Sequence, residues 1–213
     1  MSSTNTGPVA YPGDDVLLDA NMIYDQFITI PGCSPAEVFP WLVQLGAGRA
    51  GWYLPFSVEN WLVPKKSRAS RVVRPEWTAL TPGSRVYDYK MPLMDSEPPW
   101  FEVVSISPLS TEGRGEDPSS EKALVYRSER YGCVFTWTLM ARRDDSRAES
   151  SKGDTVVEPG TIVHLRFRGQ IQSTGWKRKV IVFGGGIMDY LTTAPMLLGL
   201  RERAIAAKTR RQD

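Results

Sequence analysis

The chain has 213 residues, of which 41% are hydrophobic and 23% are charged. This length and composition suit a single globular domain with one hydrophobic core. The formal net charge is +2, without the strong basic stripe that is typical of a nucleic-acid binder. We find no basic, apolar leader and no run approaching the ~18 apolar residues of a membrane span. We therefore expect a cytoplasmic protein without a transmembrane segment.

The N-terminal part predicts a loose arm, a strand and a capped helix. Residues 1–15 are polar and contain glycine and proline, which is typical of a flexible arm. Met22–Ile30 is β-branched and aromatic, and predicts the first strand. Ser34 and Glu37 have the spacing of a capping box, with a proline at the first helical position. Helical spacing of apolar residues then continues until Gly46, where a glycine can end the helix.

The middle of the chain contains five strand-like segments. They are Arg85–Lys90, Trp100–Ile106, Lys122–Glu129, Cys133–Ala141 and Thr161–Ile171. Arg130-Tyr131-Gly132 predicts a hairpin turn between the third and the fourth. The polar stretches at about 107–121 and 142–160 predict solvent loops that lengthen hairpins. A further strand-like run, Lys179–Phe183, either continues the sheet or leads into the last helix.

The C-terminal part predicts one long helix. Gly184-Gly185-Gly186 lacks the lysine and Ser/Thr of a phosphate loop, and we interpret it as a hinge. An apolar stripe follows from about Ile187 to Ala207, with Pro195 expected to kink or split the helix. A basic tail, 208–213, follows. The element order predicts an α+β fold, over residues 16–207, in which a curved antiparallel sheet wraps the last helix around an internal hydrophobic cavity.

The residue patterns exclude several kinds of chemistry. The one histidine, His164, alternates with Arg166 and Arg168 on what we expect to be the outer face of a strand. A Ser-His-Asp triad is therefore not indicated. There is no CxxC or HExxH pattern and no GxGxxG that follows a strand, so we expect no metal and no organic cofactor.

The strongest candidate site lies between Ser34 and Asn60. Arg49 and Glu59 are its expected polar centre, either as catalytic groups or as a structural ion pair. A carboxylate enclosed by aromatics has a raised pKa, an arginine can polarise a carbonyl, and Tyr53 could donate to a developing enolate. Eight further residues are expected either to pack in the core or to line a cavity and bind substrate. These are Trp52, Asn60, Tyr87, Asp88, Tyr126, Phe135, Trp137 and Met188.

Three stretches carry a resemblance to a known superfamily. They are PWLVQLGAGRAGWY (Pro40–Tyr53) with Glu59-Asn60, TIVHLRFRG (Thr161–Gly169) and MLLGLRERA (Met196–Ala204). Together they resemble the START-like helix-grip superfamily (SRPBCC), whose members include polyketide cyclases/dehydratases and lipid-transport proteins. The chain departs from the usual pattern at Leu54-Pro55-Phe56, where a hydroxyl and a carboxylate are missing from the expected pocket rim.

The resemblance implies a small hydrophobic ligand. Our first hypothesis is a cofactor-independent enzyme of cyclase/dehydratase type, acting on a hydrophobic carbonyl-containing metabolite of secondary metabolism. The alternative is a carrier that binds a lipid or hydrophobic metabolite without chemistry. A third hypothesis is an interaction module, since the basic segment Lys65–Arg74 is either a solvated loop or an electropositive rim.

Overall fold

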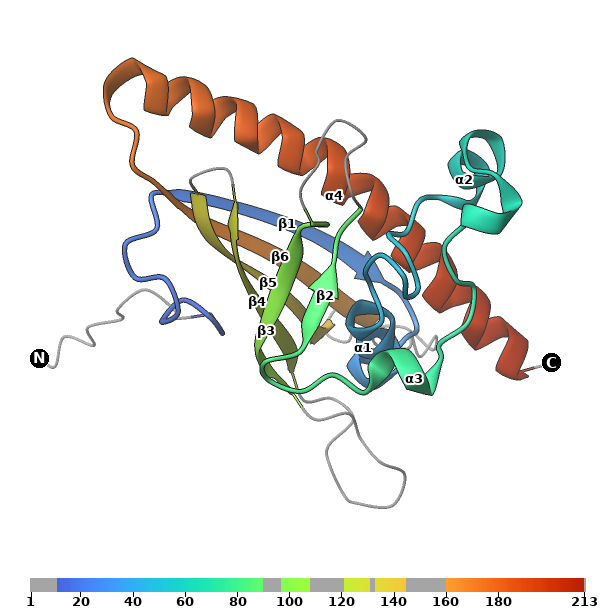
Figure 1. The fold of residues 1–213 in the computed structure, drawn as a ribbon. Helices are drawn as coiled ribbons and strands as arrows, with labels where there is room; N and C mark the ends of the chain where they lie inside the picture. Colours follow the sequence, from blue (N-terminus) through green and yellow to red (C-terminus); the bar gives the residue numbers. More distant parts are fainter. Residues whose placement is uncertain (1–10, 90–96, 108–120, 131–132, 145–159, 213) are drawn as a thin grey trace, which may run out of the picture.

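The computed structural model describes residues 11–89, 97–107, 121–130, 133–144 and 160–212. Six antiparallel strands form one open, curved sheet in the order β1-β6-β5-β4-β3-β2 (Figure 1). The strands are β1 (Met22–Ile30), β2 (Arg85–Tyr87), β3 (Trp100–Ile106), β4 (Lys122–Arg130), β5 (Cys133–Asp144) and β6 (Gly160–Ile171). The helices are α1 (Pro35–Val43), α2 (Phe56–Leu62), the 3-10 turn η1 (Lys65–Ser67), α3 (Pro75–Thr78) and α4 (Gly175–Gln212).

The strand predictions agree closely with the sheet. β1 and β3 have the predicted bounds, and β4 and β5 form the predicted hairpin, with Arg130 opposite Cys133. β5 is longer than predicted because residues 142–144 continue its pairing with β6. Most of the two expected loops, residues 108–120 and 145–159, lies outside the described residues. Tyr131 and Gly132 of the expected hairpin turn lie outside them too.

Helix α1 begins as the capping box predicts. The Ser34 hydroxyl accepts from the Glu37 backbone N–H at 3.3 Å, and the Ser34 N–H donates to the Glu37 carboxylate at 2.8 Å. Pro40 lies inside the helix, and Gly46, with φ of 126°, turns the chain after it. The apolar face of α1 packs on β4 and β5, so the helix closes one end of the sheet's concave face.

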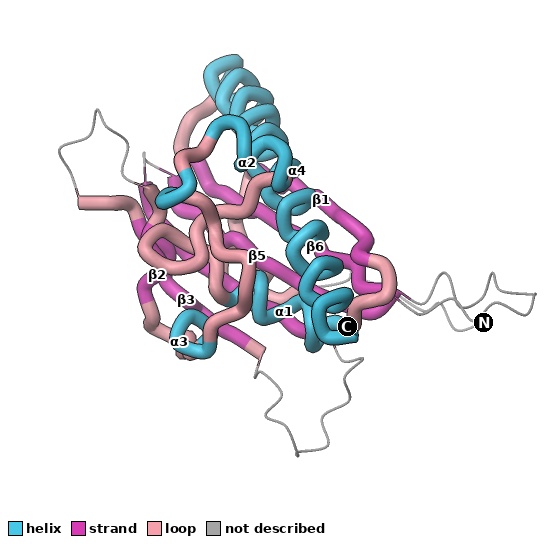
Figure 2. The backbone as a smooth tube through the Cα atoms, turned by 90° about the vertical axis from the view of Figure 1, so that its right-hand side faces the viewer, coloured by secondary structure: helices cyan, strands magenta, loops and turns pink. Residues whose placement is uncertain are grey.

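The core joins α1, the second half of α4 and the inward side chains of the sheet. Figure 2 shows α1 and α4 next to each other on the same side of the strands. Fully or nearly fully buried members include Phe39, Leu42, Leu124, Leu139, Leu165 and Leu200. The architecture is therefore the expected one: an α+β helix-grip arrangement with a long C-terminal helix against a curved antiparallel sheet.

Helix α4 differs from the prediction in its first half. It is one helix of 38 residues that begins at Gly175. The prediction of a hinge at the three glycines is therefore wrong. Of the alternatives left open by the sequence, a continued sheet at Lys179–Phe183 and a split at Pro195 are wrong as well. Local propensity disfavours a helix here, but Tyr24 of β1 packs directly on the glycines. A Cβ at Gly185 or Gly186 would lie 3.1 Å from the Tyr24 ring or hydroxyl. The Tyr24 hydroxyl also donates to the Val182 carbonyl, so a contact distant in sequence stabilises this half of the helix.

The outer face of the sheet is covered by the chain that precedes β1. Thr138 donates to the Pro12 carbonyl at 3.0 Å, and Asp14 pairs with Arg168 at 2.9 Å. Residues 11–15, which the sequence assigns to a loose arm, therefore pack on the sheet. His164 lies on this outer face as expected, but it is only 1% exposed, and Asp25 holds its Nε2 at 2.6 Å.

Candidate functional site

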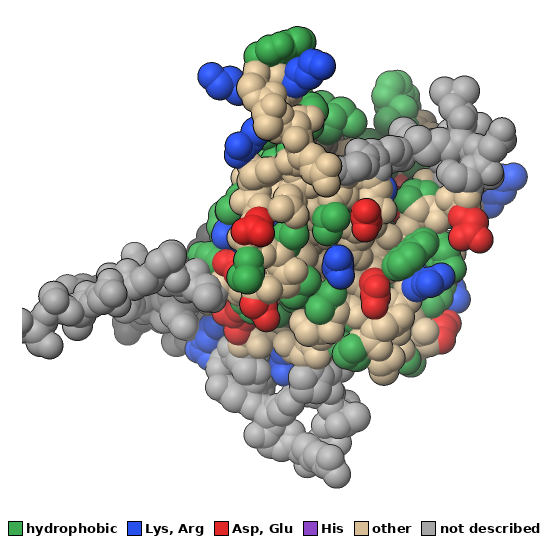
Figure 3. Space-filling model, turned by 60° about the vertical axis from the view of Figure 1, so that its left-hand side comes forward, with side chains coloured by type: hydrophobic (Ala, Val, Ile, Leu, Met, Phe, Trp, Pro, Cys, Tyr) green, Lys and Arg blue, Asp and Glu red, His purple; other side chains and the backbone are tan. Residues whose placement is uncertain are grey.

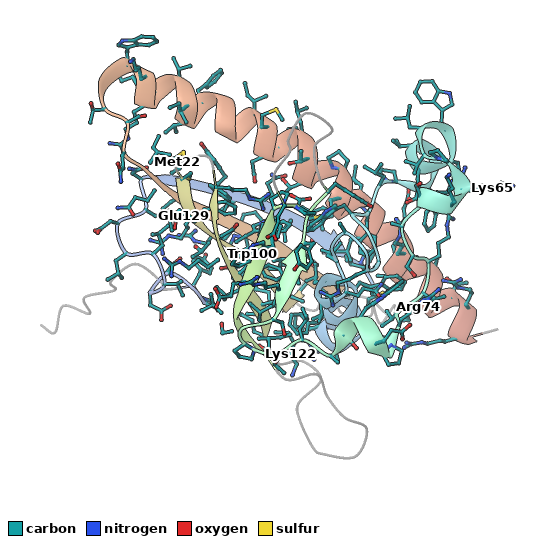
Figure 4. The ribbon with its side chains drawn as sticks, in the orientation of Figure 1. Met22, Lys65, Arg74, Trp100, Lys122 and Glu129 are labelled. Carbon is teal, nitrogen blue, oxygen red and sulfur yellow. The ribbon has the colours of Figure 1, made fainter. Side chains whose placement is uncertain are left out.

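A cavity of about 680 Å³ lies between the concave face of the sheet, the loop before α2, and α4. This volume is in the range of small-molecule sites. Six of the residues that the sequence singled out line it, and Figure 4 shows the crowded side chains between the sheet and α4. They are Trp52, Tyr53, Glu59, Asp88, Phe135 and Trp137.

A second hollow of about 670 Å³ continues along the first half of α4. Both hollows are lined by Phe167, Asp189 and Thr192, so they meet at this point of the helix. Met188, also expected to bind substrate, lines the second hollow. We call the two the main cavity and the side cavity. Together they can accommodate an elongated ligand that lies along α4.

The wall of the main cavity is mainly aromatic. Trp52, Phe101 and Trp137 pack as a triangle, in which the Trp137 ring centroid is 5.7 Å from each of the other two and those are 6.1 Å apart. Phe135 contacts Phe101 edge-on at 6.1 Å and stacks on Phe167 at 5.1 Å. Strand alternation directs these side chains inward, as the sequence predicts. The wall therefore presents flat apolar surfaces to a ligand.

Asp88 and Arg130 form the polar end of the main cavity. Arg130 donates to the Asp88 carboxylate at 3.1 Å, and the Trp52 indole N–H donates to the same group at 2.9 Å. The Arg130 guanidinium lies over the ring of Phe101, 4.4 Å from its centroid. Its buried Nε finds no hydrogen-bond partner among the described residues. Arg130 is therefore a fixed cation on an apolar wall.

Sequence reasoning missed Arg130, which it used only as part of a turn. The signal was available, because Leu124 and Tyr126 face inward and period-2 alternation continues through residue 128 to Arg130.

Asp189 is a second carboxyl group on the wall, shared by both cavities. Gln26 of β1 donates to it at 2.6 Å, and Thr193 lies beside it. Burial raises the pKa of the Asp189 carboxyl, more than these hydrogen bonds lower it. A carboxyl with a raised pKa in an apolar cavity is a candidate for proton transfer. Its signal in the sequence is a single acidic residue within an apolar helical segment.

Glu59 belongs to a buried ion pair, but its main partner is Arg203 of α4. The Arg203 guanidinium donates to the Glu59 carboxylate at 2.7 Å and to the Leu54 and Ser70 carbonyls at 2.8 and 2.9 Å. Arg71 adds a second contact to Glu59 at 3.3 Å. Arg203 is fully buried, so this network ties α4 to the segment around α2 and acts as scaffold.

Arg49 does not reach Glu59 and lines neither cavity. Its guanidinium donates instead to the carbonyls of Val43, at 3.1 Å, and Trp77. Tyr53 does line the main cavity, but its hydroxyl accepts from Gln44 at 2.7 Å and donates to a backbone carbonyl at 3.0 Å. Burial raises the pKa of the Tyr53 hydroxyl well above its usual value. The three expected catalytic groups are therefore not assembled around one point.

Three other expected residues lie outside both cavities. Asn60 is exposed and accepts from Arg68 at 2.7 Å. Tyr87 is exposed on the edge strand, and its neighbour Tyr89 lines the main cavity instead. Tyr126 is fully buried behind the aromatic wall, and burial raises its pKa.

The basic segment is largely committed to local contacts. Arg68 binds Asn60, Arg71 lies 4.0 Å from the centre of the Phe56 ring, and Arg74 lies over Trp77. Lys65 and Lys66 are exposed, and Arg74 is exposed as well although it contacts Trp77.

The fold and the site together define a class: a helix-grip domain with an apolar cavity that has polar groups at Asp88–Arg130 and Asp189. No protein-family model matches the sequence, and no curated protein is significantly similar to it. Within the described part of the chain, no group of three or more His, Cys, Asp or Glu side chains could hold a metal ion.

Proposed function

We propose that this protein binds an elongated, mainly apolar small molecule, a lipid or a hydrophobic metabolite, in the two adjoining cavities. The observation that carries the proposal is the aromatic-walled space of about 680 Å³ with one fixed cation, Arg130, at its polar end. An apolar cavity with few placed polar groups is the usual form of a small-molecule site. The polar end of the ligand, a carboxylate, carbonyl or hydroxyl, would accept from Arg130.

The residues expected to do chemistry support binding better than catalysis. Glu59 is neutralised by Arg203, Arg49 lies outside the cavities, and the Tyr53 hydroxyl accepts from Gln44 and donates its proton to a backbone carbonyl. This arrangement favours the carrier alternative over the first hypothesis from the sequence.

Binding is tested with a fluorescent fatty acid, cis-parinaric acid, titrated into the purified protein. Thr192 is exposed and lines both cavities, so Thr192→Trp should fill the space without disturbing the core. We expect saturable binding that this variant weakens at least about tenfold. Tyr190→Trp, on the same helix but outside both cavities, is the matched control and should bind normally. Equal binding by all three proteins would contradict the proposal.

The polar end is tested with Arg130→Met, which keeps the aliphatic stem and removes the guanidinium. Arg127→Met, an exposed position on the same strand, is its control. A carboxylate ligand should lose affinity only in Arg130→Met, by about 10- to 100-fold for one charged hydrogen bond. Unchanged affinity for both carboxylate and alcohol ligands would remove Arg130 from the site.

One observation favours a second candidate, an enzyme of cyclase/dehydratase type as the superfamily resemblance implies. Asp189 is a cavity carboxyl with a raised pKa. Its carboxylate would remove a proton α to a substrate carbonyl, and Arg130 would donate to the resulting enolate oxygen. After ring closure, the Asp189 acid would return that proton to the new alkoxide. Its carboxylate would then remove a second α proton and pass it to the departing hydroxyl, which leaves as water as the C=C bond forms.

The two candidates differ in the behaviour of Asp189→Asn. If the protein is an enzyme, this variant keeps ligand affinity and loses turnover of a co-purifying intermediate. If it is a carrier, the bound molecule is recovered unchanged from the wild type and the variant alike.

A further inference from the structure

The first half of α4 carries an apolar stripe that points away from the protein. Its members recur at spacings of three and four residues, which places them on one helical face. They are Trp176, Val180, Phe183, Ile187 and Tyr190, and they are between 46% and 73% exposed. A contiguous stripe of this kind on a soluble domain marks an interaction surface.

The charges around this stripe have one sign. Lys177, Arg178 and Lys179 occupy the first turn and are all exposed, and Figure 3 shows the hydrophobic tip of the molecule flanked by Lys and Arg side chains. From residue 175 to residue 201 the only acidic residue is Asp189, and Gln26 of β1 binds its carboxylate on the sheet side. The N-terminus of a helix is itself the positive end of its dipole, so this end of α4 favours an external anion.

A second copy of the chain does not supply that anion. Two copies that paired along this face would bring cations and apolar groups together without a facing carboxylate. A surface of anionic lipid headgroups supplies negative charge for the cations and an apolar layer for the stripe. An amphipathic helix rich in Lys and Arg buries its apolar face at the boundary of the acyl chains.

The main cavity opens beside this helix. Leu191 and Thr192 of α4, and Ser67 of η1, line the cavity and are also exposed, so the cavity reaches the surface between α4 and the α2–η1 segment. That segment presents a second apolar and basic edge. It consists of Trp61 and Leu62, 84% and 60% exposed, with Lys65 and Lys66.

We propose that this protein docks on anionic membrane surfaces through the first half of α4 and the α2–η1 edge, with the cavity opening facing the lipid. By length and composition α4 also passes as a membrane span, since an 18-residue window of it has a mean hydropathy of 1.4, and 17% of that window is buried. Its second half, however, packs in the core and holds Glu59 through Arg203. The exposed face of the first half of α4 therefore lies along the membrane surface and does not cross it. The residues that carry this proposal do not include Arg130.

Co-sedimentation with vesicles tests the proposal directly. We expect the full chain to bind phosphatidylcholine vesicles with about 30% phosphatidylserine, to bind pure phosphatidylcholine much less, and to be released at about 0.5 M salt. Lys177→Ala/Lys179→Ala should weaken partitioning about thirtyfold, at roughly 1 kcal/mol per charge. Phe183→Ser should weaken it at least about tenfold through lost apolar burial.

Two controls separate this surface from general effects. Leu18→Ser removes an apolar side chain that is 78% exposed on the segment before β1, and Arg127→Ala removes an exposed charge from β4. Both should bind vesicles normally, and cis-parinaric acid binding should be unchanged in every variant. Equal vesicle binding by all variants would overturn the proposal, as would a dimer in solution that Phe183→Ser dissociates. Bound protein that resists salt and alkaline carbonate would overturn it in favour of a spanning helix.

Discussion

Replacing Arg203 by methionine should destabilise the fold strongly. The variant removes the donor at 2.7 Å from the Glu59 carboxylate and two donors to backbone carbonyls. Breaking a buried pair on one side costs about 3–5 kcal/mol, because the other charge stays buried. Arg71 remains 3.3 Å from Glu59, and its side chain is 41% exposed. We therefore expect the lower end of that range, about 3 kcal/mol.

Urea denaturation followed by circular dichroism measures this loss. With a slope of about 2 kcal/mol/M, the midpoint should fall by about 1.5 M urea. Arg201→Met, at an exposed position two residues earlier on α4, should change stability by no more than about 0.5 kcal/mol. Arg203→Met/Glu59→Gln should recover part of the loss. A drop of less than about 1 kcal/mol in Arg203→Met would refute the assignment of Glu59 to the scaffold.

Three further predictions follow from single contacts and titrations. Gly199→Ala should lower the melting temperature, since a Cβ there would lie 2.5 Å from the Leu54 backbone, whereas Gly184→Ala, with nothing within 4 Å, should not. Burial lowers the pKa of His164, so its NMR titration should have a midpoint below 6.5. The contribution of His164 to the free energy of unfolding should be complete above pH 6.5 and should be lost as the pH falls toward that midpoint. A midpoint above 6.5 would contradict this prediction. The pKa of Asp189 is raised above 3.8 in the folded protein. Its contribution to stability should therefore be complete below pH 3.8 and should be lost as the pH rises through the pKa of the folded state. Asp189→Asn should flatten this dependence of stability on pH, and an unchanged dependence would count against the prediction.

Local patterns predicted most of the sheet and failed in α4. β1 and β3 were found because alternation and turn residues act within a few positions. The run Lys179–Phe183 has strand propensity, but its helix is stabilised by Tyr24, which packs on the glycines from another element. Such a contact between distant elements cannot be predicted from the local sequence.

The candidate site, too, was predicted only where local patterns determine it. The inward aromatics Phe135 and Trp137 follow from strand alternation. The partner of Glu59 could not be predicted from local patterns, because Arg203 lies 144 residues further along the chain. Arg49 was expected instead because it is the nearest cation in the motif. Polar groups that lie on separate elements, such as Asp88 and Arg130, meet only once the sheet is formed.

The central claim is that the cavities hold a hydrophobic small molecule. Native mass spectrometry of the protein purified from its own host, followed by denaturation and identification of what is released, tests it most directly. We expect a stoichiometric lipid or hydrophobic metabolite in the wild type and in Tyr190→Trp, and none in Thr192→Trp. A wild-type protein that carries no ligand, and that takes up none from a host lipid extract, would contradict it.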